Sequence, residues 1–278
     1  MTLNMKKFIP NLSTYLILSF FALSTILPFY WMVTTSLKTD MEALAMPPKL
    51  FPWPLYFQNF PDVFRVVPML QGFINSSKVA LITVVGVIFS CSLAAYSFSK
   101  IKFKGSNILF GMIIATMLIP SQVTMIPLYV IFSKMGWVDT HLPLIVPHIF
   151  INAYGVFLIN QFMSSIPDSY IEAAQIDGGG HFMIYSKIVL PLCKPALVTL
   201  GLFTFIWSWN SFLVPLIYLN TDTKFTITII INSLRNEFYL NWGLMMAAAS
   251  VAILPIAIVY FIGQKFFIEG IALSGLKA

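Results

Sequence analysis

The sequence predicts an all-α polytopic membrane protein whose chain crosses the bilayer with six transmembrane helices. Three observations predict this class: 58% of the 278 residues are hydrophobic, only 9% are charged, and the charges leave long uncharged stretches between them. Soluble domains contain about 25% charged residues, and one charge at the centre of a membrane helix costs about 2.5–3.5 kcal/mol. The charged residues should therefore mark the ends of the membrane spans.

Six uncharged stretches are each long enough for one span, since a helix needs about 20 apolar residues to cross about 30 Å of hydrocarbon. A transmembrane β-strand would instead show about ten residues of alternating hydrophobicity, a pattern that this sequence lacks. We predict spans at about residues 11–36, 73–98, 107–132, 141–163, 195–219 and 242–264. No segment between them is large enough to fold alone, so residues 1–278 should form a single transmembrane domain.

The positions of the basic residues predict the orientation of the chain. The loop that carries Lys100, Lys102 and Lys104 contains no acidic residue, whereas the loops on the opposite side pair their cations with acidic residues. Cytoplasmic loops are enriched in lysine and arginine, so both termini should be cytoplasmic. The first apolar stretch is too long for the apolar region of a signal peptide and should be retained as a span. The net charge of +6 indicates contact with anionic membrane lipid, not with nucleic acid.

A charged, glycine-broken segment lies between the fourth and fifth spans, at residues 164–194. It reads as two short helices, the first capped by Ser165 and ended by Gly178 in a left-handed conformation. The second should cover about residues 182–189 and stop at Pro191. Taken alone, this pattern also fits an amphipathic hairpin that merely rests on the bilayer surface.

Seven spaced residues in this segment resemble the coupling loop of binding-protein-dependent ABC importer permeases: Glu172, Ala173, Ala174, Gly178, Ile188, Leu190 and Pro191. Four further segments look like the carbohydrate-uptake branch of that family, at residues 73–76, 96–100, 209–215 and 263–277. The resemblance covers essentially the whole chain and is closest to the maltose-type second membrane subunit. One departure is the run of glycines from Gly178 to Gly180, where the family has Gly-Ala and a small polar residue.

The resemblance implies a type I ABC importer permease architecture in the inner (cytoplasmic) membrane of a bacterium. It implies that the coupling loop docks in a cleft of a cytosolic ATPase, with Glu172 at the contact and Ile188, Leu190 and Pro191 anchoring the loop. The coupling residues implied are Glu172, Ala173, Ala174, Asp177, Gly178, Ile188, Leu190 and Pro191. A contact of the C-terminal tail with the ATPase is implied for Ser274, Gly275 and Leu276.

The partners implied are a homologous second permease subunit, two cytosolic ABC ATPase subunits and an extracellular or periplasmic solute-binding protein. The cargo implied is a carbohydrate, a di- or oligosaccharide. The chain has no G-x-x-x-x-G-K-[ST] phosphate loop, so ATP must be bound by another polypeptide. Its three histidines lack the spacing of metal ligands. We therefore expect no cofactor, no metal and no catalytic residue in this chain, which should be a transporter subunit and not an enzyme.

Polar residues inside the spans are candidates for the translocation path, because lipid-facing polar groups are costly. Sugars carry many hydroxyls, so amides and the ring faces of Trp207 and Trp209 would suit them. Intramembrane amides often only join helices, however, for about 0.6 kcal/mol each. The candidates are Asn75, Ser76, Asn152, Asn160, Trp209 and Asn210.

Other functions stay open at this point. The chain could be an ABC importer permease for another small solute, or a purely structural subunit. A secondary transporter would need ionisable residues within its spans for ion coupling, and only histidines occur there. A membrane enzyme would need a convergent acid–base or metal cluster, which the sequence does not show.

Overall fold

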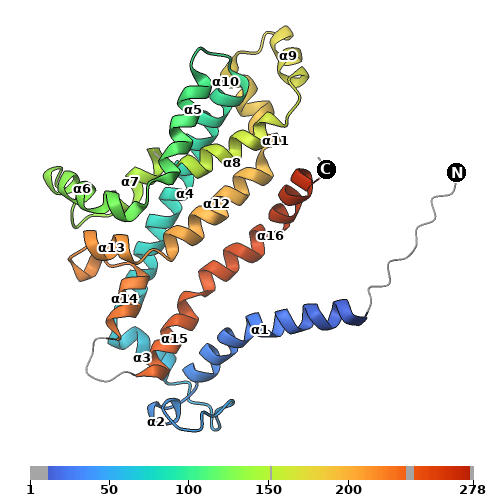
Figure 1. Ribbon diagram of the computed structural model, residues 1–278. Coiled ribbons are helices and arrows are strands. Elements are labelled where there is room, and N and C mark those ends of the chain that lie inside the picture. The colour runs from blue at the N-terminus through green and yellow to red at the C-terminus, as the bar shows by residue number, and fades with distance from the viewer. Residues whose placement is uncertain (1–11, 151, 236–240, 276–278) are drawn as a thin grey trace. The chain divides into compact units, whose positions relative to one another are not determined.

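The computed structural model describes residues 12–150, 152–235 and 241–275, and these residues form helices and turns without a strand. Figure 1 traces them from the N-terminus to the C-terminus. Contacts along the chain divide it into two compact units. The first comprises Met1–Val67 and Ser233–Ala252, and the second comprises Pro68–Asn232 and Ile253–Ala278.

The first unit consists of α1 (Leu12–Ser36), α2 (Asp40–Ala43), α3 (Asn59–Val66) and α15 (Trp242–Ala252), and the first three helices all pack against α15. A buried amide holds the turn after α1: Asn59 Nδ2 donates to the carbonyls of Ser36 and Lys38 at 2.9 and 2.8 Å. The Lys38 ammonium is itself buried, 4.3 Å from the centre of the Trp31 ring. Residues 14–30 of α1 are all exposed in the isolated chain, as expected of a helix that lies against lipid or another subunit.

The second unit is built around α4 (Met69–Lys100), which packs against α7 (Leu142–Phe150), α8 (Ala153–Ser164) and α12 (Lys194–Trp209). Helix α16 (Leu254–Gly275) packs on α12. The buried stripe of α4 repeats every four residues, at Val79, Thr83, Val87, Cys91 and Ala95. This spacing keeps one helix face toward its neighbours.

The third predicted span is broken in the structure. Helix α5 (Ser106–Ala115) continues as a 3₁₀ turn, η1 (Thr116–Leu118), and meets α6 (Ser121–Lys134) at 98°. Pro120 explains the break, because a proline disfavours the helical conformation of the residue before it, and Ile119 is extended.

The fifth predicted span, at residues 195–219, is also interrupted. Helix α12 has 16 residues, which corresponds to about 24 Å. The chain then turns before α13 (Leu213–Tyr218), and Asn210 Nδ2 donates to the carbonyl of Ile206 at this turn. The chain continues beyond this predicted span with η3 (Asp222–Lys224) and α14 (Ile227–Ser233).

Four helical stretches are long and apolar enough to cross a membrane, and the count reaches six if each of two bent pairs is one span. The four are Thr14–Ser36, Met69–Lys100, Leu142–Ser164 and Trp242–Lys265. The two bent pairs are α5–η1 with α6, and His181–Leu192 with α12, the latter bent by 76°. The predicted all-α polytopic membrane fold is confirmed.

Candidate functional site

The segment between α8 and α12 contains three short helices and one π-helical turn. These are α9 (Ser169–Ile176), α10 (His181–Ile184), η2 (Tyr185–Val189, π-helical) and α11 (Leu190–Leu192). We call residues 165–193 the α9–α11 segment; Figure 1 shows α9 and α10 at the same end of the second unit as α5. The prediction that Ser165 caps α9 is wrong: α9 begins after Asp168, and the Ser165 hydroxyl bonds to the Phe162 carbonyl.

Gly178 ends α9 as predicted. Its φ of +82° is left-handed, a conformation that glycine adopts without steric cost. Gly178 N–H donates to the Gln175 carbonyl at 3.0 Å, and Gly179 N–H donates to the Ala174 carbonyl at 2.8 Å. This pair of bonds forms a Schellman motif, which satisfies two of the free carbonyls at the end of the helix.

Helix α9 has one face against the protein and one face in solvent. Ile171 and Ala174 are buried in the hydrophobic core of the second unit, whereas Glu172, Ala173 and Asp177 are exposed. The exposed face therefore carries two carboxylates beside a small alanine side chain, which lets another backbone approach closely.

The second half of the segment departs from a simple helix. The chain is π-helical over Tyr185–Val189, and the Leu190 N–H donates to the Tyr185 carbonyl. Pro191 has no N–H to continue the pattern, so it leaves a carbonyl of the preceding turn without its usual donor. Pro191 itself lies within α11, and the chain turns at Cys193. Ile188 and Leu190 are partly buried against the core.

Three residues on one stripe of α4 hold this segment, at the spacing i, i+4 and i+8. The stripe consists of Ser92, Tyr96 and Lys100. Ser92 Oγ lies 2.8 Å from the Tyr185 hydroxyl, and Tyr96 OH lies 3.3 Å from His181 Nδ1. The Tyr96 and Tyr185 rings meet edge to face at 5.4 Å.

Among these three residues, Lys100 makes the ionic contact. Its Nζ lies 2.7 Å from Asp168 Oδ1 and donates to the Ile166 carbonyl at 2.6 Å. The Lys100 side chain is 2% exposed and that of Asp168 is 68% exposed. The hydrogen bond from Lys100 is the main cause that lowers the pKa of Asp168. The α9–α11 segment is thus attached to the end of α4 by polar and aromatic contacts. In the sequence, residues 96–100 were notable only for their resemblance to the carbohydrate-uptake branch. This attachment was not predicted.

An open cavity of about 1040 Å³ lies beside α9. Lys102 and Lys104 line one side of it, and Asp168, Glu172 and Gln175 line the other. The carboxylates of Asp168 and Glu172 therefore lie beside the basic loop after α4, in a depression that is accessible from outside the chain.

The C-terminal helix α16 ends at Gly275, so Ser274 and Gly275 lie in its last turn. Leu276 lies outside the described residues. The contact of these residues with an ATPase stays a prediction.

Four of the six candidate path residues use polar atoms within the chain, and the bond of Asn210 to the Ile206 carbonyl is one of them. Asn75 Nδ2 donates to the carbonyls of Thr223 and Phe225, and Ser76 Oγ accepts the Ile227 N–H. Asn152 caps α8 by accepting the Gly155 N–H at 2.7 Å. Each bond fixes a helix end or a loop.

Trp209, Asn210 and Asn160 differ in exposure. Trp209 is 2% exposed and stacks on Phe205, so its ring belongs to the core of this chain. Asn210 is exposed, and Asn160 is buried with its Oδ1 unpartnered among the described residues. The role of all six in a path stays a prediction.

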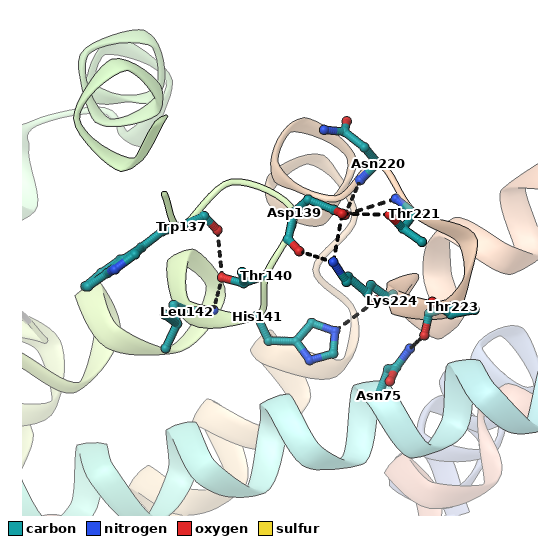
Figure 2. A network of polar contacts seen from close by, with 10 residues as sticks. All are labelled: Asn75, Trp137, Asp139, Thr140, His141, Leu142, Asn220, Thr221, Thr223 and Lys224. Atoms are coloured by element: carbon teal, nitrogen blue, oxygen red, sulfur yellow. Dashed lines mark hydrogen bonds and ion pairs between the residues drawn. The ribbon is translucent and has the colours of Figure 1, made fainter. Parts of the chain in front are cut away.

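Figure 2 shows a polar network that sequence reasoning did not find. It joins the loop before α7 to the loop around η3. Asp139 accepts the N–H groups of Asn220 and Thr221 through Oδ1, and the Thr221 hydroxyl and Lys224 ammonium through Oδ2. His141 Nε2 donates to the Lys224 carbonyl. These donors, Lys224 first, hold the pKa of Asp139 well below its usual range.

Within residues 12–150, 152–235 and 241–275, no three His, Cys, Asp or Glu side chains come together as a metal site would require.

Comparison with known proteins identifies a family to which this chain is similar. The family "Binding-protein-dependent transport system inner membrane component" matches residues 84–272. The arabinooligosaccharides transport system permease protein AraQ of Bacillus subtilis is 31% identical, over 96% of this chain and 98% of its own. The starch degradation products permease protein AmyC of Thermoanaerobacterium thermosulfurigenes, named as probable, is 32% identical over 90% of this chain and 91% of its own.

A chain of a bacterial ABC transporter that imports the acidic polysaccharide alginate has the same fold. Its TM-score is 0.79 at 23% sequence identity, over 96% of this chain and 99% of that chain. The predicted family resemblance is confirmed, and membership implies a partner permease, an ATPase and a binding protein. The chain therefore belongs to the binding-protein-dependent transport system inner membrane components, the permease subunits of ABC importers.

Proposed function

We propose that this chain is one of two homologous permease subunits of an ATP-driven importer that carries a di- or oligosaccharide into the cytoplasm. The names of AraQ and AmyC support a carbohydrate cargo. An extracellular or periplasmic solute-binding protein delivers the sugar, and two cytosolic ATPase subunits supply the energy. Both termini lie in the cytoplasm, as does the α9–α11 segment.

The observation that carries this proposal is the two-sided character of α9. Its inner face, with Ile171 and Ala174, packs into the core, and its outer face presents Glu172, Ala173 and Asp177 to a partner. The ATPase binds this outer face. Its motion reaches α4 through the contacts of Lys100, Tyr96 and Ser92.

Helix α4 packs against α7, α8 and α12, so a displacement of its end can change the packing of these three helices. ATP binding then has to favour one conformation of the permease, inward-facing or outward-facing, over the other. A shift from 1:99 to 99:1 needs about 5.5 kcal/mol of differential binding. The α9–α11 segment is the part of the chain through which that preference is transmitted.

Replacement of Glu172 by alanine tests the coupling. Asp222→Ala is the matched control, because Asp222 is also an exposed carboxylate but lies in η3, outside the α9–α11 segment. In the complex reconstituted with its native partners, Glu172→Ala should lower ATP-driven sugar uptake at least about tenfold, equivalent to about 1.4 kcal/mol. The amount of chain in the membrane should not change. Unchanged uptake in this variant would exclude the proposed role of Glu172.

A single cysteine tests the orientation. Ser169 is exposed in α9, whereas the native Cys91 and Cys193 are 1% and 0% exposed and should react slowly. Ser169→Cys should react with a membrane-impermeant maleimide in inside-out vesicles and stay unlabelled in right-side-out vesicles. The reverse pattern would place the α9–α11 segment outside the cell and contradict the proposal.

A further inference from the structure

The loop between α1 and α3, residues 37–58, leaves large apolar side chains uncovered, and we call it the α1–α3 loop. It belongs entirely to the first compact unit. Over residues 46–57, five large apolar side chains are at least 60% exposed: Met46, Leu50, Phe51, Trp53 and Phe57. Soluble surfaces rarely expose so many apolar side chains close together, and where they do, the surface contacts protein or membrane. These five side chains therefore need a partner outside the chain.

The backbone of the α1–α3 loop is fixed at several points by the end of α1. Lys38 Nζ donates to the Lys49 carbonyl at 2.7 Å, and the Tyr56 N–H donates to the Leu37 carbonyl at 2.9 Å. Pro52 is buried in the middle of the loop. A folded backbone therefore holds the apolar side chains outward.

The charges of the α1–α3 loop are engaged within the first unit. Lys38 is buried, and the Lys49 ammonium pairs with Glu42 at 2.8 Å. Asp40 Oδ2 accepts from the Asn241 amide at 2.8 Å. The two lysines balance the two acidic residues, so the loop has no net charge. Such a loop suits a neutral apolar partner better than a charged one.

The position of the loop matches the edge of the bilayer. Helix α1 has 25 residues, which corresponds to about 37 Å, against a hydrocarbon thickness of about 30 Å. The loop begins directly after this helix, at Leu37. The Tyr30 hydroxyl donates to the Leu50 carbonyl at 3.0 Å. Because Tyr30 lies about 9 Å before the end of α1, this bond brings the loop back beside the exposed side of the span.

We propose that the α1–α3 loop is an interfacial anchor, which lies in the headgroup region of the membrane with Trp53 and its apolar neighbours inserted toward the acyl chains. Tryptophan and tyrosine are enriched at this depth, because their rings are apolar while their N–H or O–H groups stay hydrated. Interfacial segments bury their apolar side chains about 5–10 Å into this boundary. The proposed cytoplasmic N-terminus assigns the anchor to the outer leaflet, whereas contact with lipid does not depend on that orientation.

The solute-binding protein is the other candidate partner on this side, and the exposed side chains fit it less well. A binding protein that delivers a solute must dock and leave, and each departure would return five large apolar side chains to water. Transient interfaces are also only about as apolar as the rest of a protein surface. Lipid, in contrast, covers these side chains permanently, so the observations favour the membrane.

Spin labelling of the complex, assembled with its native partners in lipid nanodiscs, tests the anchor. A nitroxide is attached to the Trp53→Cys variant, and wild type gives the background, since Cys91 and Cys193 are buried. Oxygen concentrates in hydrocarbon and a nickel chelate stays in water, so relaxation by each reports depth. The ratio of oxygen to nickel accessibility should be at least about threefold higher for Trp53→Cys than for the control Thr223→Cys, whose side chain is exposed in η3.

Every other outcome overturns the anchor. A nitroxide at position 53 that the nickel chelate reaches as easily as at position 223 lies in water. One that neither reagent reaches is covered by protein, such as the homologous permease. A signal that changes when a saturating amount of the solute-binding protein is added assigns the loop to that protein. None of these results bears on sugar uptake or on Glu172, so the proposed function is tested separately.

Fluorescence of the native ring gives a second test without a label. The emission of Trp53 is the difference between wild type and Trp53→Phe in the assembled complex. Phosphatidylcholine with bromine near the top of its acyl chains quenches tryptophans on contact and should lower this emission by about half or more. Trp209→Phe is the control, because Trp209 is 2% exposed, unlike the 49% exposed Trp207 on the same helix. Quenching of Trp53 no greater than that of Trp209 would contradict the anchor.

Discussion

The ammonium of Lys100, at the end of α4, lies 2.7 Å from the carboxylate of Asp168, just before α9. The two groups have very different surroundings, since the lysine side chain is 2% exposed and the aspartate side chain is 68% exposed. Lys100 also donates to the Ile166 carbonyl. The lysine is therefore the buried member that ties the α9–α11 segment to a membrane helix, and Asp168 is its solvated partner.

Lys100→Met should impair coupling more than Asp168→Asn. The methionine variant loses both bonds and leaves the Ile166 carbonyl without its donor, at a local cost of about 1–3 kcal/mol. The asparagine variant keeps an oxygen that can accept from Lys100. We expect Lys100→Met to retain ATP hydrolysis while sugar uptake falls, and hydrogen exchange in residues 165–193 to increase. Equal uptake by the two variants would contradict this asymmetry.

Gly178→Ala should weaken coupling through the backbone alone. The φ of +82° strains any residue with a Cβ, at about 1–2 kcal/mol, although no atom lies within 4 Å of the added carbon. Gly180→Ala is the matched control, because Gly180 also has open space around it and has a φ of −77°. Uptake measured for both should fall only for Gly178→Ala, and Gly178→Asn should be intermediate. A loss of the same size in Gly180→Ala would mean that the turn conformation is not the cause.

Asp139→Ala should lower the thermal stability of the complex more than Asp139→Asn. Asparagine tolerates the left-handed φ of 59° at this position and can keep an acceptor for the N–H groups of Asn220 and Thr221. Alanine removes every side-chain acceptor. Differential scanning fluorimetry should show a Tm lower by about 2–4 °C for alanine. Identical Tm values for the two variants would show that the network does not stabilise the loops.

The same network predicts a pH dependence. The folded-state pKa of Asp139 is lowered, mainly by Lys224, so its contribution to stability is fully present above the unfolded value of about 3.9. It is lost as the pH falls through the folded-state pKa. The Tm difference between wild type and Asp139→Asn should be constant between about pH 5 and pH 7 and should shrink below about pH 4. A difference that already disappears near neutral pH would contradict the assignment.

Gly243→Ala should destabilise the first unit. An added Cβ would lie 2.6 Å from Asn59 Nδ2 and 2.8 Å from the Lys38 carbonyl, and it would disturb the amide that closes the turn after α1. Overpacking of this kind costs about 1–3 kcal/mol. Gly111→Ala is the control in the interior of α5, where nothing lies within 4 Å and alanine favours the helix. Gly243→Ala should lower Tm and Gly111→Ala should leave it equal or higher; a fall of the same size in both would exclude the steric cause.

The broken helices show a feature of the fold that the hydropathy of the sequence does not predict. The uncharged stretches located the apolar helices, but the sequence did not predict that α5 and α6 meet at 98° or that α12 ends at Trp209. A hydropathy pattern records which residues can enter lipid. It does not record the direction in which the chain leaves a proline or a helix end, because that direction depends on which neighbouring groups satisfy the freed backbone atoms.

The sequence by itself determined the membrane class, the segment with Glu172 and the left-handed end of α9 at Gly178. These features depend on local composition and on the backbone freedom of single residues. Only the tertiary structure decided which polar groups are already bonded, as Asn75 is to Thr223 and Phe225, far away in sequence. It also separated Trp207 from Trp209: residues two apart on a helix point to opposite faces. Since lipid and core are both apolar, hydrophobicity alone cannot tell which of these two faces lies inside.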